Sequence, residues 1–476
     1  MSALRSIDEL PGPKGVPFFG NARQISSMQF HLSLERWAQE FGPLCRVRFG
    51  PSKMLIVSDP VLIGSMLRDR PDVFRRTSRS ARIASELLTT GVFSSEGEDW
   101  KRQRKLVMRG LTPEVIRSFF PTLNLLTRRL LERWQSAIAA GREVDVLRDL
   151  KAWTLDVTIW IAMGQDIDTL AHPDNPLQGD IEHIFNRMAR RLTTGFPYWR
   201  YFKLPADRAA DACSARIHTA VAGFVAETRK RIEANPGLRA KPTNLLEAFV
   251  TARDEPGSEF TDRHVIGNAI TMVFAGEDTT SNTMAWLLDF LARDPGVAAR
   301  MAAEADTVLG EGETLQEFAG LEKFTYTDAC VDEAMRLKPV APFLGLETNV
   351  ETEVGDVRLE KHTPIMVITR LAGRSETDFP QADEFRPERW LKDKSAEKSS
   401  SVGGDPGRKL FPFGGGPRFC PGRYLAMAEI KMIMSMVAKN FTLEMDASAP
   451  PVKELFTFTM TPSSLPVKLR VRGEKP

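Results

Sequence analysis

The segment from Asp262 to Arg293 contains no proline and is dominated by apolar residues. It is roughly 30 residues long, and an α-helix of that length extends about 45 Å, enough to cross a whole domain. Its middle holds a polar cluster, Ala275-Gly-Glu-Asp-Thr-Thr280. A buried carboxylate costs free energy unless it is satisfied, and a threonine hydroxyl can bond the carbonyl four residues back. The sequence predicts a central helix with a polar notch in the wall of a cavity, or a polar network without chemistry.

A single cysteine, Cys420, ends the glycine-rich run that begins at Phe413. The apolar residues from about Tyr424 to Asn440 predict a helix directly after it. A thiolate in this position is stabilised by backbone N–H groups and by the positive end of the helix. No histidine and no other cysteine lies nearby in the sequence, so the pattern indicates one sulfur with one function. A haem iron held by one axial thiolate fits this pattern.

The remaining sequence predicts a mainly α protein with small β-sheets attached, an α+β fold class. Apolar and polar residues alternate in residues 44–58, which predicts a β-hairpin, and residues 356–369 are predicted as a second strand region. We expect one domain over residues 1–476. It has a proline-rich entry segment at residues 1–20 and an exposed loop rich in Ser, Lys and Gly at residues 392–409.

The composition argues against several classes of protein. The net charge of +2 gives no field that would favour nucleic acid as a partner. The four cysteines are scattered without the spacing of a zinc site or a disulfide framework, which favours a reducing compartment. No apolar run approaches the ~18 residues needed to span a bilayer, and no secretory signal is visible. We therefore expect a cytoplasmic protein without a transmembrane anchor.

Five residues around the cysteine match a known signature. Phe413, Gly416, Arg418, Cys420 and Gly422 occupy the fixed positions of Phe-x-x-Gly-x-Arg-x-Cys-x-Gly. Through this signature the chain resembles the cytochrome P450 family of haem-thiolate monooxygenases, and we expect a soluble, bacterial-type member. The resemblance implies haem b with Cys420 as the axial ligand of the iron. It also implies the cytochrome P450 fold, in which the long central helix lies over a buried haem.

The same resemblance gives roles to the polar cluster of the long helix. Asp278 and Thr279 match the acid and the alcohol of the family's oxygen-activating segment. Activation of O₂ needs protons, and a hydroxyl beside the iron can hold a water to which a carboxylate relays them. The resemblance therefore implies that Asp278 and Thr279 are catalytic. Glu277, the preceding carboxylate, receives no role.

Several residues match positions that hold the haem. Trp100 and Arg104 match partners of a haem propionate, Arg418 matches another, and Phe413 belongs to the cofactor loop. The planar donor fork of arginine suits a carboxylate. Some members have a further propionate-binding arginine later in the chain, whereas Glu347 stands here at the place where it could fall. Four other basic residues near Trp100 form either a docking surface for an acidic electron donor or an ordinary solvated face: Lys101, Arg102, Lys105 and Arg109.

Glu333 and Arg336 stand three residues apart in a segment predicted as a helix, Asp328–Leu337. This spacing puts both side chains on one face, within reach of an ion pair. In the family that the chain resembles they form a buried network with an arginine of a later loop, which Arg389 matches. We expect this network to be structural rather than chemical, because loss of one partner would leave a buried charge.

The resemblance also outlines a substrate pocket whose residues are nearly all apolar: Phe93, Ala275, Phe343, Leu344, Phe456 and Phe458. An apolar pocket implies a small lipophilic substrate such as a fatty acid, terpenoid, steroid or polyketide, although each residue taken singly could be ordinary core. The segment Phe196–Phe202 carries five aromatic residues. It has three interpretations: a lid over the access channel, a contact with a membrane surface, or packing within the fold.

These residues together predict a monooxygenase that inserts one atom of O₂ into a C–H or C=C bond, by hydroxylation or epoxidation. The chain ends soon after Cys420. We therefore expect no fused reductase domain and a separate electron donor, a ferredoxin or flavodoxin with its NAD(P)H-driven reductase. The alternatives are a haem-thiolate peroxygenase or isomerase, which the intact acid–alcohol pair argues against, and a non-catalytic haem-thiolate sensor. A thiol hydrolase is the alternative without haem, but none of the six histidines has a recognisable partner motif.

Overall fold

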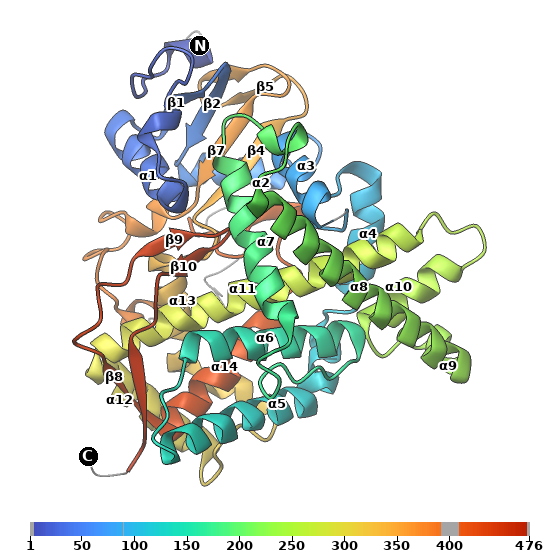
Figure 1. The fold of residues 1–476 in the computed structure, drawn as a ribbon. Coiled ribbons are helices and arrows are strands. Elements are labelled where there is room, and N and C mark those ends of the chain that lie inside the picture. Colours follow the sequence, from blue (N-terminus) through green and yellow to red (C-terminus); the bar gives the residue numbers. More distant parts are fainter. Residues whose placement is uncertain (1–3, 89, 392–408, 474–476) are drawn as a thin grey trace.

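Helix α11 (Asp262–Arg293) runs through the centre of the molecule in the computed structural model, which describes residues 4–88, 90–391 and 409–473 (Figure 1). Its bounds are those predicted from the run of apolar residues without proline. The helix ends before Asp294, whose side chain accepts hydrogen bonds from the N–H groups of Gly296 and Val297. These bonds cap the next helix, α12 (Pro295–Leu309), which has proline at its first position.

The other helices surround α11. They are α1 (Phe30–Phe41), α2 (Pro60–Arg68), α3 (Ser78–Leu87), α4 (Gly97–Arg109), α5 (Pro113–Ala139), α6 (Val146–Met163), α7 (Pro176–Thr193), α8 (Pro205–Ala234), α9 (Gly237–Ala240), α10 (Leu245–Asp254), α13 (Thr325–Leu337) and α14 (Arg423–Asn440). Helix α14 begins one residue before the predicted start, and α13 begins three residues before it.

Helix α6 packs closely along α11. A Cβ atom on Gly276 of α11 would lie 2.0 Å from the hydroxyl oxygen of Thr158 on α6, so only glycine permits this approach. Helices α5, α6 and α14 lie on one side of α11, and the larger sheet lies on the other (Figure 1). The segments that carry the candidate site therefore converge on α11 from several directions.

Within the described residues, the strands form one larger sheet and three small ones. The five-stranded sheet has the order β1-β2-β7-β4-β3, in which β2 and β7 are parallel and the other pairs are antiparallel. Its strands are β1 (Leu44–Phe49), β2 (Ser52–Val57), β3 (Phe74–Arg76), β4 (Phe343–Thr348) and β7 (Pro364–Ile368). The two-stranded sheets pair β5 (Thr352–Val354) with β6 (Val357–Leu359), β8 (Phe441–Met445) with β11 (Val467–Val471), and β9 (Glu454–Phe456) with β10 (Met460–Pro462).

The buried apolar residues fall into a large cluster among the helices around α11 and two smaller clusters against the five-stranded sheet. The predicted fold class, mainly α with small sheets, is confirmed. Among the described residues, no helix combines the length and the apolar character that crossing a membrane would require. The predicted loop at residues 392–409 lies outside the described residues except for Lys409, which is exposed.

Candidate active site

Cys420 sits in a tight loop that leads into α14. Its N–H donates a hydrogen bond to the carbonyl oxygen of Phe413, 2.9 Å away. Gly414 and Gly416 both have left-handed backbone conformations, with φ of 73° and 63°. A Cβ atom on Gly416 would also lie 2.0 Å from the carbonyl oxygen of Leu67 on α2. The shape of the loop therefore requires both glycines, and the contact with α2 requires Gly416, which is the one that belongs to the predicted signature.

The surroundings of the Cys420 sulfur differ from those of the other thiols. Cys420 keeps accessible surface, whereas the other three cysteines are buried: Cys45, Cys213 and Cys330. Burial raises the pKa of Cys45 to about 12, with no charged group or hydrogen bond acting against it. Burial raises the pKa of Cys420 as well, but the N–H groups of Gly422 and Arg423 and the guanidinium of Arg104 favour its thiolate. Cys420 therefore has support for negative charge that Cys45 lacks, and this support includes two backbone N–H groups.

The notch predicted in α11 is a stripe of accessible residues on a helix whose middle is otherwise buried. Thr271, Ala275 and Thr279 follow one another at intervals of four and keep accessible surface. This spacing puts them on one face of the helix. The hydroxyl of Thr279 donates a hydrogen bond to the carbonyl oxygen of Ala275, 2.9 Å away, as predicted. Protein side chains therefore leave one hydroxyl-bearing stripe of α11 uncovered.

Asp278, beside Thr279, is buried in a polar network that the sequence did not predict. Its carboxylate accepts hydrogen bonds from the amide of Asn282 (2.9 Å) and from the hydroxyl of Thr459, and it lies 3.9 Å from the Lys151 ammonium. Burial raises the pKa of Asp278, and Lys151 opposes that rise. Lys151 also pairs with Glu182 on α7 at 2.7 Å. Asn282 could have been inferred, since it is a polar residue one helical turn from Asp278 in a buried helix.

Glu277 lies where α11 packs against α6. Its carboxylate is buried, and neither oxygen has a hydrogen-bond partner. Burial raises the pKa of Glu277 well above its ordinary value, and Lys151 acts against this. The backbone carbonyl of Glu277 accepts a hydrogen bond from the hydroxyl of Thr154 on α6 (2.9 Å). Burial therefore favours the neutral form of this carboxyl, which the sequence alone did not indicate.

The residues predicted to hold propionates lie between α4 and the cysteine loop. The guanidinium of Arg418 stacks 4.3 Å from the ring of Trp100 and donates hydrogen bonds to Ser95 O (2.7 Å) and to the Glu96 carboxylate. Arg104 donates to the carbonyl oxygen of Phe419, next to the cysteine. Burial lowers the pKa of Arg418 to about 10. The structure thus brings Trp100, Arg104 and Arg418 together, and Phe413 lies in the same loop.

Two of the four basic residues considered on α4 pair with neighbouring carboxylates. Lys101 pairs with Glu98 at 2.7 Å, and Arg102 pairs with Glu259. Pairs of this kind are typical of a solvated helix face. The contacts of Lys101 and Arg102 agree with a solvated face, and the docking surface stays a prediction.

Glu333 is fully buried and accepts hydrogen bonds from two segments, its own helix α13 and residues 386–390. Arg336 donates to both of its oxygens at 2.8 Å, Arg389 donates at 3.1 Å, and the indole N–H of Trp390 donates at 2.9 Å. Arg336 in turn donates to backbone carbonyls, including that of Ala382 at 2.6 Å. The predicted ion pairs are present. Trp390 and the carbonyl acceptors have no signal at the level of the sequence.

The predicted pocket residues do not form one group but lie in several packing clusters. Phe93 and Phe458 meet at 5.8 Å, and Phe458 stacks on Phe185 of α7 at 5.4 Å. By contrast, Phe343 and Phe456 pack on each other at 4.9 Å within the cluster that covers α1. Leu344 packs in the cluster between the five-stranded sheet and α2, and Ala275 is accessible on α11. Phe456 is thus a buried core residue, as its plain interpretation allowed, and Leu344 packs against a core cluster but keeps accessible surface.

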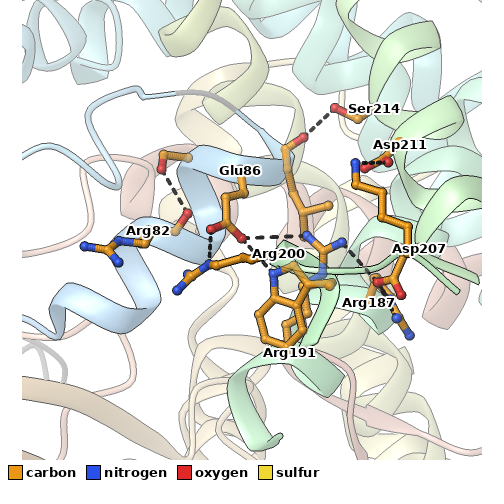
Figure 2. A network of polar contacts seen from close by, with 12 residues as sticks. Arg82, Glu86, Arg187, Arg191, Arg200, Asp207, Asp211 and Ser214 are labelled. Carbon is orange, nitrogen blue, oxygen red and sulfur yellow. Dashed lines mark hydrogen bonds and ion pairs between the residues drawn. The ribbon is translucent and has the colours of Figure 1, made fainter. Parts of the chain in front are cut away.

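The aromatic segment Phe196–Phe202 is bound to the helices on either side of it. Glu86 on α3 accepts hydrogen bonds from the indole N–H of Trp199 (2.9 Å) and from Arg200 (2.6 Å; Figure 2). Asp207 on α8 accepts from Arg187 (3.0 Å) and Arg191 (3.2 Å) of α7 (Figure 2). Trp199 is buried, and three other aromatic residues of the segment are exposed: Phe196, Tyr201 and Phe202. The segment is therefore anchored by one aromatic residue and by ion pairs.

A buried carboxylate beside a hydroxyl on a long central helix, and one cysteine in a glycine loop with cations around it, are together the features of a mainly helical haem-thiolate enzyme. Residues 10–469 match the family model described as Cytochrome P450. The chain belongs to the cytochrome P450 family. Members of this family are monooxygenases that bind haem b through a cysteine thiolate.

The similar proteins come from several kinds of organism. The "Putative cytochrome P450 CYP13A5" of Caenorhabditis elegans is 28% identical, over 97% of this chain and 93% of that protein. "Cytochrome P450 3A15" of Cavia porcellus is 25% identical over 98% and 90%, and "Protein LUTEIN DEFICIENT 5, chloroplastic" of Arabidopsis thaliana is 23% identical over 93% and 74%. All three are eukaryotic, so they give no support to the prediction of a bacterial-type member.

Proposed function

We propose that this enzyme inserts one atom of O₂ into a small lipophilic substrate by hydroxylation or epoxidation, with Cys420 as the iron ligand. The observation that carries the proposal is the uncovered stripe of α11, where Thr279 presents a hydroxyl and Asp278 lies directly beside it in a buried network. A sensor or an isomerase has no need for this acid–alcohol pair. Electrons come from a separate donor, a ferredoxin or flavodoxin with its reductase.

The residues around Cys420 fit a haem. Haem iron held by a thiolate supplies the capacity to activate O₂. Two backbone N–H groups and Arg104 favour negative charge on the Cys420 sulfur. Trp100, Arg104 and Arg418 would hold the propionates, because guanidinium groups bind carboxylates through paired hydrogen bonds. The partly buried Phe413 ring would pack beside the cofactor, in the same loop.

Asp278 and Thr279 would bring protons to the reacting oxygen. Thr279 holds a water at the uncovered stripe, and Asp278 passes protons to it from the protein. Glu182 is 42% exposed and pairs with Lys151, which in turn lies 3.9 Å from Asp278. This series of groups connects solvent to the middle of α11. Since burial raises the pKa of Asp278, its carboxyl holds a proton more readily than an exposed aspartate does.

The lipophilic substrate is proposed from the aromatic residues that approach α11. Phe93, Phe458 and Phe185 form a continuous series of rings, and Phe185 also meets Phe274 of α11 at 5.0 Å. Such a wall offers apolar area and few hydrogen-bond partners, so it selects by shape and hydrophobicity. We also propose a cytoplasmic location, supported by the four unpaired cysteines.

The experiment that tests this function measures product formed per electron consumed. Cofactor loading is first verified by the red-shifted Soret band of the reduced protein under CO, which Cys420→Ser should abolish. A panel of lipophilic compounds is then screened for spin-state shifts, and one that binds is turned over. Thr279→Ala should divert electrons to peroxide and lower coupling about tenfold or more.

Thr283→Ala is the matched control. Thr283 lies one turn further along α11, is buried, and makes the same type of bond to the carbonyl four residues back. It should keep the coupling of the unmodified enzyme. Equal coupling in Thr279→Ala and Thr283→Ala would contradict the role of Thr279 in proton delivery. If no compound of the lipophilic panel shifted the spin state, the proposed substrate class would be contradicted.

A further inference from the structure

Three arginine side chains meet around a single carboxylate beside the cysteine loop. Arg70 follows α2, Arg76 ends β3, and Arg418 precedes Cys420. The Nε atom of each is buried and has no hydrogen-bond partner. Glu96 is the acid that faces them: it accepts from the side chain of Arg418 and, at 3.2 Å, from the backbone N–H of Arg76. Arg70 and Arg76 also interact with the charge of Glu96, so three positive charges face one negative charge, an excess of two. Arg104, a further cation near Arg418, faces the Cys420 sulfur.

The register of β3 directs Arg76 into the protein. Strand β3 pairs with β4 so that Arg75 lies opposite Glu347 and Arg76 lies opposite Leu346. Successive side chains of a strand point to opposite faces. Arg75 donates to the Glu347 carboxylate at 2.7 Å, so Arg76 points the other way, where its guanidinium stacks 3.8 Å from the ring of Phe93.

The excess of buried positive charge in this cluster costs free energy. A buried cation without an anion loses its hydration and gains little in return. Burial lowers the pKa of Arg76 to about 9, and the neighbouring Arg70 and Arg418 lower it further while Glu96 opposes them. Arg76 nevertheless keeps some accessible surface, although its Nε is buried. Its guanidinium therefore has donors available for an anion.

We propose that Arg76, together with Arg70 and Arg418, binds two carboxylates, and that these are the two propionates of the haem. Strand β4 lacks an arginine, and Glu347 occupies the position considered for one. Arg76 supplies a guanidinium from the neighbouring strand instead, directly opposite Leu346 of β4. Two propionates balance the excess of two positive charges. This inference rests on the proposed function, because it needs Cys420 to hold a haem.

A substrate carboxylate is the other possible source of the same chemistry, because Phe93 belongs to the proposed substrate wall. The position of Arg418 next to the iron ligand favours the propionates. The two sources make different predictions. Loss of Arg76 weakens the retention of haem in the first case, and it weakens only the binding of acidic substrates in the second.

The test measures how fast the holoenzyme loses haem to an excess of apomyoglobin. Arg76→Met should lose haem about tenfold faster or more, because a charge-assisted pair is removed. Arg76→Lys keeps the positive charge but lacks the planar guanidinium. Its rate of haem loss should fall between the rates of Arg76→Met and of the unmodified enzyme. Arg75→Gln is the matched control, since Arg75 stands on the same strand but faces Glu347, and it should lose haem at the unmodified rate.

A second measurement keeps the test valid if Arg76→Met folds poorly. Haem-extracted protein, unmodified and Arg76→Lys, is reloaded with haem or with haem dimethyl ester, which lacks both carboxylates. The difference in retention between the two proteins should disappear with the ester. A difference that persists with the ester would show that Arg76 affects haem retention through the fold of the protein and not through the propionates. This result would overturn the proposal.

Two other outcomes would also overturn it. Equal rates of haem loss in Arg76→Met, Arg75→Gln and the unmodified enzyme would exclude the propionates. If Arg76→Met then lost the spin-state shift of fatty acids but kept that of their methyl esters, the carboxylate would belong to the substrate. An unmodified protein without the red-shifted Soret band under CO would instead contradict the proposed function, so the two failures are distinguishable.

Discussion

Two glutamates of this enzyme accept hydrogen bonds from the same kinds of partner in different surroundings. Glu333 on α13 binds the indole N–H of Trp390 at 2.9 Å and the guanidinium of Arg336 at 2.8 Å. Glu86 on α3 binds the indole N–H of Trp199, also at 2.9 Å, and the guanidinium of Arg200 at 2.6 Å. The side chain of Glu333 is 0% exposed, whereas that of Glu86 is 26% exposed.

Burial decides what each carboxylate can do. Removing one partner of a buried ion pair leaves a charge that water cannot reach, whereas water replaces the partner of an exposed pair at little cost. The network of Glu333 therefore acts as a permanent brace of the fold. The network of Glu86 should cost less free energy to break, because water can reach its charges. Equal geometry thus does not imply equal energy.

Among the substitutions that test this comparison, Glu333→Gln should have the largest effect. The substitution leaves Arg336 buried without its anion, so the free energy of unfolding should fall by about 3–5 kcal/mol. Urea unfolding followed by circular dichroism measures this. A protein that cannot be purified would agree with it, provided that Glu86→Gln, the same substitution at the partly exposed site, is obtained in normal yield.

The opposite ordering of the two variants would contradict the argument from burial. It would mean that the segment bound by Glu86 contributes more to the fold than the network of Glu333 does. A change below about 1 kcal/mol in Glu333→Gln would show that the buried pair is offset by its own desolvation.

The difference between the two networks also explains what the sequence could reveal. Glu333 and Arg336 lie three residues apart on one helix, so helical spacing predicts their contact. Trp199 stands 113 positions after Glu86, and no local pattern indicates that the two meet. The same limit applies to the partners of Asp278, since Thr459 comes from the C-terminal hairpin.

The fold could be predicted where its determinants are local. The bounds of α11 follow from the absence of proline and from Asp294–Pro295, which begin the next helix. Helix α13 begins three residues early because Glu304, on α12, accepts hydrogen bonds from the N–H groups of Tyr326 (2.6 Å) and Thr327 (2.8 Å). A cap supplied by another helix leaves no signal in the segment that it caps.

Glu429 on α14 sharpens the comparison, because it is as buried as Glu333 but has no cation. One of its oxygens has no partner, and burial raises its pKa from 4.5 to about 8. Between those pH values the folded protein keeps a proton that the unfolded chain has lost, so stability falls as pH rises. From pH 5 to pH 8 the stability of Glu429→Gln relative to the unmodified protein should increase, on the order of 2–3 kcal/mol.

Urea unfolding of both proteins at the two pH values measures this difference, because contributions of other groups cancel. A stability difference that is independent of pH would show that Glu429 titrates normally. A loss of stability at pH 8 in the variant would mean that Glu429 is ionised and paired like Glu333, and burial alone would then not separate the two.

Glu86→Gln should produce the smallest effect on stability, less than about 1 kcal/mol, because water replaces the lost ion pair. Its effect should be local: amide hydrogens of residues 200–202 should exchange about three- to fivefold faster, as expected when the segment opens more often. The control is Glu98→Gln, which removes an exposed pair with Lys101 on α4 and should leave this exchange unchanged. If the segment is a lid, lipophilic ligands should also bind faster in Glu86→Gln. Unchanged exchange together with unchanged ligand association would mean that buried Trp199 alone holds the segment, and that it packs as part of the core.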